Sequence, residues 1–206
     1  MLLAIDTSAG SSVAIVDREA GVLAEAAETS TMRHAEVIGL LIADVLAASG
    51  VAPSALSGVA TGMGPGPFTG LRVGIAAARA FAFGAELPVV PVVSHDALAY
   101  EQYASGHDGS LLIVTDARRN ERYWSAYSGR DENGLPQRLS APGLSRPDEV
   151  PYSEFVRYDA VRVSAACLGL LAERRYQLGY PPDSDEPLYL RSPDVTLSAG
   201  PKRVSP

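Results

Sequence analysis

The stretch TGMGPGPFTGLRVG, residues 61–74, decides how the chain folds because it forces a tight, glycine-rich turn between two regular elements. It follows an apolar segment of strand type and opens a segment of helical type. Thr69 stands where a helix N-cap belongs, so we expect a helix from Gly70 to about Phe83 that ends at Gly84. Such a loop directs backbone N–H groups and a helix dipole at one point, where it either binds an anion or begins a contact with another chain.

The composition indicates a globular protein without a membrane span or a disulfide framework. The 206 residues are 47% hydrophobic and 20% charged, which suits one domain or two small lobes. The opening MLLAID predicts a strand rather than a signal peptide, and the lone Cys167 suits a reducing compartment, so we predict a cytoplasmic protein that contacts no membrane. A net charge of −7 argues against a stand-alone nucleic-acid binder.

The first half of the chain predicts a strand hairpin followed by alternating helices and strands. Apolar residues recur at helical spacing between His34 and Ser49, and Gly50 follows as a stop signal. Ser94 is expected to cap a further helix that reaches about Tyr103. The expected strands are Leu2–Asp6, Ser12–Val16, Gly21–Glu28, Ser57–Thr61 and Val89–Val93.

The pattern restarts in the second half. Leu111–Asp116 is a strand-type run that ends in aspartate, as Leu2–Asp6 is, and a polar turn and a second strand-type run, Arg122–Ser128, follow it. This repetition predicts an internal duplication. A helix is expected over Val163–Arg175, whereas the Pro- and Gly-rich residues 133–151 predict a loop.

We therefore predict an α/β fold of duplicated lobes, the second of them abbreviated, as in the actin/Hsp70/sugar-kinase (ASKHA) architecture. The N-terminal lobe is expected over residues 1–105 and the shortened C-terminal lobe over residues 110–197. Residues 198–206 are expected to form a flexible tail.

The glycine-rich stretch matches neither common nucleotide-binding motif. A P-loop requires a lysine that reaches the phosphates, and Phe68 and Thr69 occupy that region here. The dinucleotide fingerprint requires an acidic residue at a set distance, which is missing. The motif alone therefore leaves a capped structural turn and an anion site as equal alternatives.

The helix that the loop opens carries small residues at four-residue spacing, namely Gly70, Gly74, Ala78 and Ala82. Such a stripe lets another helix approach closely, either inside the lobe or at a subunit interface. Arg72 is a cation in the first turn and opposes the helix dipole, which favours a specific role, such as an ion pair or a partner contact, over a solvated arginine.

Two polar turns offer groups that could contact an anion. We favour an Asx-type turn for Asp6-Thr7-Ser8, whereas the arginines after Asp116 suit phosphate, a partner's carboxylates or solvent equally. The candidate anion or nucleotide contacts are Asp6, Thr7, Ser8, Gly66, Thr69, Gly70, Arg118 and Arg119.

No metal site and no catalytic residue are predicted. None of His34, His95 and His107 has a second ligand at a suitable spacing on its own helix face. No nucleophile, base and orienting group can be assembled from the sequence.

The chain resembles the TsaB (YeaZ) family in several short motifs. The segment GPGPFTGLRVG, residues 64–74, is the most specific of them, and the resemblance covers the first lobe nearly throughout and the second in patches. The other matching motifs are LAIDTS at residues 3–8, HAE at 34–36, DARR at 116–119, YLR at 189–191 and PDVT at 193–196.

The resemblance implies a non-catalytic scaffold that binds the catalytic subunit TsaD, with the ATPase TsaE joining them. That complex transfers a threonylcarbamoyl group to N6 of adenosine 37 in tRNAs that read ANN codons, so tRNA contact would be indirect. A homodimer is implied when TsaD is absent. No cofactor is implied for the chain itself, and ATP or ADP with Mg²⁺ would bind only at the level of the complex. The implied interface residues are His34, Val37, Ile38, Leu41, Val45, Arg72, Val73, Gly74, Ala77 and Ala78.

Local departures from the catalytic relatives agree with a scaffold. The metal-binding His-x-x-x-His pair is missing because Ile38 follows His34 by four residues, and the glycines of a nucleotide pocket are missing after Asp116. The alternative hypothesis is an ATP-binding enzyme of the actin/sugar-kinase type that uses Asp6 and Asp116; a glycoprotein peptidase is disfavoured. Little room is expected between Asp148 and the helix near Val163 for the strand that the family usually shows.

Overall fold

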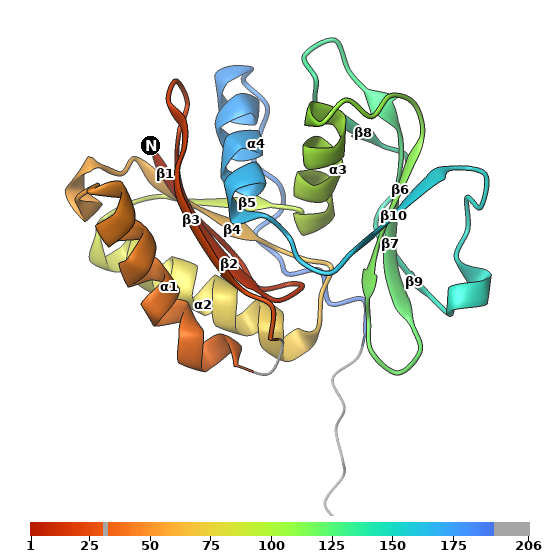
Figure 1. Ribbon diagram of the computed structural model, residues 1–206, viewed down its shortest axis with the longest axis horizontal. Coiled ribbons are helices and arrows are strands. Elements are labelled where there is room, and N and C mark those ends of the chain that lie inside the picture. The colour runs from red at the N-terminus through yellow and green to blue at the C-terminus, as the bar shows by residue number, and fades with distance from the viewer. Residues whose placement is uncertain (31–32, 192–206) are drawn as a thin grey trace, which may run out of the picture.

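The computed structural model describes residues 1–30 and 33–191. Its helices and sheets are stacked in layers, with one pair of helices outside the first sheet and another pair between the two sheets (Figure 1). The first sheet has the strand order β3-β2-β1-β4-β5. Its strands are β1 (Leu2–Asp6), β2 (Ser11–Asp17), β3 (Gly21–Glu28), β4 (Gly58–Gly62) and β5 (Val89–Val92).

The central strand of the first sheet is β1, and every one of its residues is buried. It pairs antiparallel with β2, with Leu3 opposite Ile15, and parallel with β4, with Leu3 opposite Val59. Helices on both faces explain why β1 is continuously apolar up to Asp6 rather than alternating.

Helices α1 (His34–Ser49) and α2 (Phe68–Gly84) cover the outer face of the first sheet (Figure 1). Gly50 ends α1 in the left-handed conformation, as predicted. The predicted N-cap at Thr69 is wrong: α2 begins at Phe68 after Pro67, and no described side chain caps this end. The fixed φ of Pro67 sets the entry angle of the helix instead.

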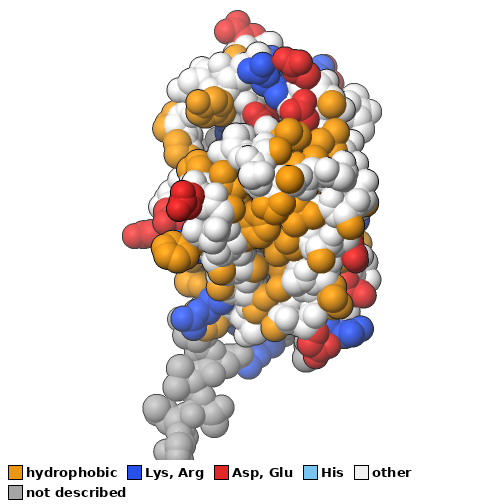
Figure 2. Space-filling model, turned by 90° about the vertical axis from the view of Figure 1, so that its left-hand side faces the viewer, with side chains coloured by type: hydrophobic (Ala, Val, Ile, Leu, Met, Phe, Trp, Pro, Cys, Tyr) orange, Lys and Arg blue, Asp and Glu red, His pale blue; other side chains and the backbone are white. Residues whose placement is uncertain are grey.

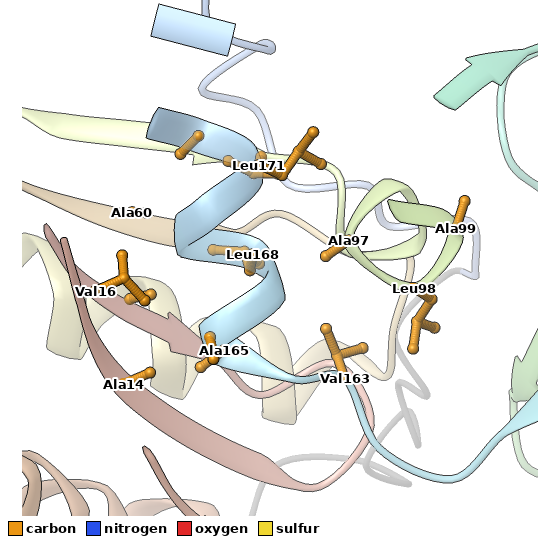
Figure 3. Packing of buried hydrophobic residues seen from close by; sticks show 14 of the residues in the cluster. Ala14, Val16, Ala60, Ala97, Leu98, Ala99, Val163, Ala165, Leu168 and Leu171 are labelled. Atoms are coloured by element: carbon orange, nitrogen blue, oxygen red, sulfur yellow. The ribbon is translucent and has the colours of Figure 1, made fainter. Parts of the chain in front are cut away.

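The other two helices lie between the sheets, and each packs against the sheet of the other half of the chain. α3 (Ser94–Ala104), which follows the first sheet in sequence, packs against β6, β7 and β8, whereas α4 (Ala165–Gln177) packs against β1, β2 and β3. Figure 3 shows Leu168 and Leu171 of α4 beside Val16 and Ala60 of the first sheet. The predicted lobe boundary at residues 105–110 stays a prediction. Each half of the chain contributes one helix to the other half's sheet, so the two halves interlock in space.

The second sheet repeats the strand order of the first. It runs β10-β6-β7-β8, and β9 also pairs with β7. β6 is antiparallel to β7 and parallel to β10, as β1 is to β2 and β4, which confirms the predicted duplication. Its strands are β6 (Leu111–Asp116), β7 (Arg122–Arg130), β8 (Pro136–Arg138), β9 (Gly143–Ser145) and β10 (Val156–Ala160).

Two predictions for the second lobe are wrong. The expected loop at 133–151 contains β8, β9 and the 3₁₀ turn Pro147–Glu149, and β10 fills the stretch that seemed too short for a strand. Three-residue strands show no periodicity, and β10 is an edge strand whose charged residues Arg157 and Asp159 pair on its exposed side.

The second lobe is abbreviated on its outer face. An irregular segment covers this face in place of helices, with Tyr152 packed 5.0 Å from Phe155 and 5.9 Å from Trp124 between ring centroids. Within the described residues, no helix combines the length and the apolar character needed to cross a bilayer. Cys167 lies half-buried on α4, and burial raises the pKa of its thiol to about 11.

Two helical glycines test how tightly α2 sits on the first sheet. A Cβ at Gly74 would overlap Thr7 Oγ1, whereas a Cβ at Gly39 on α1 meets nothing within 4 Å. We expect Gly74→Ala to lower the free energy of unfolding by about 1–3 kcal/mol through overpacking. Gly39→Ala is the matched control and should raise it by up to about 1 kcal/mol through helix propensity. Urea titrations measure the free energy of unfolding of both variants. An unchanged free energy of unfolding in Gly74→Ala contradicts the tight contact between Gly74 and Thr7.

Candidate partner interface and interlobe cleft

The buried carboxylate of Asp6 joins the turn after β1 to the glycine-rich stretch at residues 61–74, which we call the glycine loop. Asp6 Oδ1 accepts hydrogen bonds from the backbone N–H and the hydroxyl of Ser8, at 2.8 and 2.7 Å. Asp6 Oδ2 accepts one from the Ser94 hydroxyl at 2.6 Å, and Ser94 Oγ accepts from the N–H of Gly64 at 3.1 Å. A Cβ at Gly62 would overlap Asp6 Oδ2. Burial raises the pKa of Asp6, and the hydrogen bonds from Ser94 and Ser8 oppose that rise.

The other side of the loop closes against α1 and the same turn. Thr7 Oγ1 donates a hydrogen bond to the Gly70 carbonyl at 2.7 Å, and Ser11 Oγ lies 2.8 Å from His34 Nδ1. A Cβ at Gly70 would lie 2.7 Å from the Thr7 carbonyl oxygen, and one at Gly66 would lie 2.9 Å from the backbone of the turn after β1. The glycines are therefore needed for close backbone contact.

The candidate anion contacts fall into separate groups. Those brought together in the buried network are Asp6, Thr7, Ser8, Gly66 and Gly70. Thr69 is exposed on α2, and Arg118 and Arg119 lie in the turn between β6 and β7, where both have positive φ, 64° and 50°. Asp116 forms an ion pair with Arg122 at 2.8 Å. The predicted N-cap at Ser94 is wrong, because the N-cap of α3 is Val93; the Ser94 hydroxyl instead donates to Asp6, a role that sequence reasoning missed.

The cleft between the lobes is small. It is lined by Ser8 and Pro67 on one side and by Asp116, Arg118 and Val161 on the other, and it encloses 160 Å³. Pockets for small molecules and cofactors measure about 300–1,000 Å³. No group of three metal-ligating side chains occurs among the described residues. This pocket is smaller than that range, and Asp116 is the one carboxylate among its lining residues.

The predicted interface residues of α1 and α2 mostly face inward, which corrects their assignment. The side chains of His34, Val37, Ile38, Leu41 and Val45 are buried on α1, and Gly74 and Ala78 are buried on α2. They pack on the first sheet. The main apolar stripe of each helix belongs to the hydrophobic core of the lobe itself. Val73 and Ala77 are half-buried, and Arg72 is exposed.

The outer face of α1 and α2 is apolar as well. Figure 2, which views the molecule from the side of these helices, shows hydrophobic side chains gathered down the middle of the face with charged groups toward its ends. Leu40 on α1 is 65% exposed and Phe83 on α2 is 88% exposed. The same two helices carry half-buried apolar residues that flank their buried stripes, namely Ile42, Leu46, Val73, Ala77 and Phe81.

Sequence reasoning missed Leu40 and Phe83, although a signal for this face was present. The two helices carry just four charged residues, Glu36, Asp44, Arg72 and Arg79. A surface helix of a monomer normally carries a charged stripe opposite its apolar one. Large exposed apolar patches occur at contact sites for proteins, membranes or ligands. We call the apolar outer side of these two helices the α1–α2 face, defined by Leu40, Ile42, Leu46 and by Val73, Ala77, Phe81 and Phe83.

A polar network fills the space where α3 meets the second sheet. The imidazole of His95 lies between two hydroxyls, with Ser125 Oγ 2.8 Å from Nδ1 and Thr115 Oγ1 2.9 Å from Nε2. Burial, with a smaller repulsion from Arg138, lowers the pKa of His95 to about 3. Two hydroxyls suit a neutral ring, which needs one donor and one acceptor, so His95 is a structural group of the interior.

Comparison with known proteins agrees with this architecture. Residues 6–140 match a family model described as "TsaD: tRNA N6-adenosine threonylcarbamoyltransferase". The chain is 34% identical over 150 residues to Escherichia coli "tRNA threonylcarbamoyladenosine biosynthesis protein TsaB", covering 72% of this chain and 64% of that protein. It is also 34% identical to an uncharacterized Mycobacterium leprae protein, covering 95% of this chain and 56% of that one. The solved structure of YeaZ from Pseudomonas aeruginosa matches with a TM-score of 0.73 at 28% identity, covering 86% and 92% of the two chains.

These features define a two-lobed α/β protein of the actin-like class whose first-lobe helices expose large apolar side chains. The chain belongs to the TsaB (YeaZ) family. It spans 56% and 64% of the length of the first two relatives, so the similarity covers a part of each of them.

The dependence of the free energy of unfolding on pH tests the burial of His95 and its contacts with Ser125 and Thr115. Its pKa is lowered from 6.5 to about 3, so its neutral form stabilises the fold at neutral pH and the unfolded chain takes up an extra proton as pH falls below 6.5. We expect this one group to reduce the free energy of unfolding by about 1.4 kcal/mol per pH unit between those values. NMR of the ring should show no titration from pH 8 to 5, and His95→Gln should flatten the decline. A ring that titrates near pH 6.5 contradicts the assignment.

Proposed function

We propose that this chain is the scaffold subunit of an assembly that makes threonylcarbamoyladenosine in tRNA, and that the α1–α2 face binds TsaD. The Escherichia coli relative carries a name for that biosynthesis, and the matching family model is described as the transferase that completes it. TsaE would join the pair, tRNA would be held by the assembly rather than by this chain, and a second copy of this chain would occupy the face when TsaD is absent.

The observation that carries the proposal is the exposed apolar face. Leu40 and Phe83 hold large apolar side chains in water, and burying one of them in an interface contributes about 1.5–3 kcal/mol. Arg72 and Glu36 are exposed on the same two helices and can contribute to a polar rim, as interfaces usually have. The face is built from regular helices packed on a sheet, so it is presented without prior ordering of a loop.

The state of the acidic residues supports a role without catalysis by this chain. Asp6 is enclosed by hydrogen bonds from Ser8 and Ser94, and Asp116 pairs with Arg122. Asp116 lines the cleft without a second carboxylate among the lining residues, and Asp6 does not line it, whereas the actin/sugar-kinase alternative would need carboxylates that hold Mg²⁺ there.

Charged substitutions on the face test the interface. Leu40→Asp and Phe83→Asp should leave the fold intact, because both side chains are exposed, and should weaken binding to TsaD at least about 30-fold by placing a carboxylate in an apolar contact. Val161→Asp is the matched control, since Val161 is 82% exposed in the second lobe. Biolayer interferometry measures the affinities.

The same variants are then used in a reconstituted tRNA threonylcarbamoylation assay with TsaD and TsaE. The rate should fall with the loss of binding and recover at high concentrations of the variant. Unchanged affinity for TsaD in both variants rejects the interface, and equal modification in the absence of this chain rejects the scaffold role.

Nucleotide binding separates the proposal from the enzymatic alternative. The cleft of 160 Å³ predicts no heat on titration of the isolated chain with millimolar ATP and Mg²⁺. Binding that is lost in Asp116→Asn would favour the actin/sugar-kinase-like enzyme. Arg18→Ala, at an exposed position outside the cleft, is the control for nonspecific effects.

A further inference from the structure

The segment that follows α4, Asp183–Arg191, crosses from the first lobe to the second with hardly any regular structure of its own. It is nevertheless attached to the rest of the molecule at both ends and in the middle. Its last three residues are the YLR motif noted in the sequence, whose role the α1–α2 face does not explain. We call this segment the C-terminal brace.

The brace begins at the junction of α3 and α4. Asp183 Oδ2 accepts hydrogen bonds from Arg175 Nη1 at 2.7 Å and from the backbone N–H of Val93 at 2.9 Å. The other nitrogen of Arg175, Nη2, donates to Asp96 Oδ2 at 2.7 Å, and Asp96 is almost fully buried. This end is therefore fixed to the interior by charge-assisted hydrogen bonds.

The middle of the brace contacts α2 and the glycine loop. Asp185 forms an ion pair with Arg79 of α2 at 2.9 Å. The backbone N–H of Leu188 donates a hydrogen bond to the Met63 carbonyl at 2.8 Å. The middle of the brace thus lies beside the glycine loop and α2.

The YLR motif closes the brace over the first turn of α2 and onto the second lobe. The Tyr189 ring lies 4.8 Å from the Phe68 ring, and the guanidinium of Arg72 lies 4.9 Å from the centre of the Phe68 ring. Arg191 Nη1 donates to the Ala117 carbonyl at 3.1 Å, and its Nη2 forms an ion pair with Glu121 at 3.3 Å without hydrogen-bond geometry.

We propose that the C-terminal brace is a positioning element that holds the first turn of α2 in place against the second lobe and so fixes the orientation of the α1–α2 face. That turn needs outside support, because no described side chain caps it and Arg72 opposes its dipole. Tyr189 supplies the support through Phe68, the first residue of the helix. The second half of the proposal, the effect on partner binding, rests on the proposed function.

The first test uses the free chain. Tyr189→Ala removes the ring contact with Phe68, and hydrogen exchange of the amides of residues 63–72 should then accelerate about two- to tenfold. Tyr189→Phe retains the ring and should restore protection. Tyr176→Ala is the matched control, since Tyr176 is 83% exposed on α4 and outside the brace. Unchanged exchange at residues 63–72 in Tyr189→Ala overturns the proposal.

The second test adds TsaD. Tyr189→Ala should raise the concentration needed for half-maximal tRNA modification by the same two- to tenfold factor, with the maximal rate unchanged and with recovery in Tyr189→Phe. Faster exchange with unchanged affinity overturns the positioning role and leaves a local packing contact. If the wild-type chain does not bind TsaD, the proposed function fails together with the effect on binding, whereas exchange in the free chain still decides whether the brace holds α2.

Discussion

The hydrogen-bonded carboxylate of Asp6 is the contact on which the rest of the first lobe depends. It receives its donors from Ser8 and Ser94, which belong to the turn after β1 and to the start of α3, and Ser94 in turn accepts from the glycine loop. Three segments far apart in sequence therefore meet at one buried carboxyl group. A buried carboxylate is tolerated only when such donors surround it, so the glycine loop has to lie where a side chain at Gly62 would not fit.

The same constraint determines how the acidic residues at the strand ends are used. In an actin-like architecture the ends of the first strands of the two lobes face a cleft, and here one carboxylate at these ends is used for internal bonding and the other for an ion pair. The glycine loop packs closely against the backbone of the turn after β1. The surface that we propose for a partner is the outer side of α1 and α2, where the helices carry few charges.

Much of this fold follows from sequence patterns that have a direct physical cause. The strand hairpin, the helix ended by Gly50 and the repeated strand ending in aspartate were all predictable because period, stop signals and repetition are local properties. The orientation of the helices was not, because an apolar stripe has the same spacing whether it packs on its own sheet or on another chain. Ala78 was therefore assigned to an interface although it belongs to the core. The partnership of Ser94 with Asp6 joins residues 88 positions apart, which no local pattern records.

The exchange of α3 and α4 between the sheets has a consequence for how the chain acquires its structure. The inner face of the first sheet, with Val16 and Ala60, is covered by α4, whose residues come more than a hundred positions later in the chain. During synthesis the first sheet can pair its strands early, yet one of its faces stays without its apolar cover until residues 165–177 have emerged from the ribosome. The two lobes are therefore expected to reach their native packing together, as one cooperative unit, rather than as a finished first lobe to which a second is added.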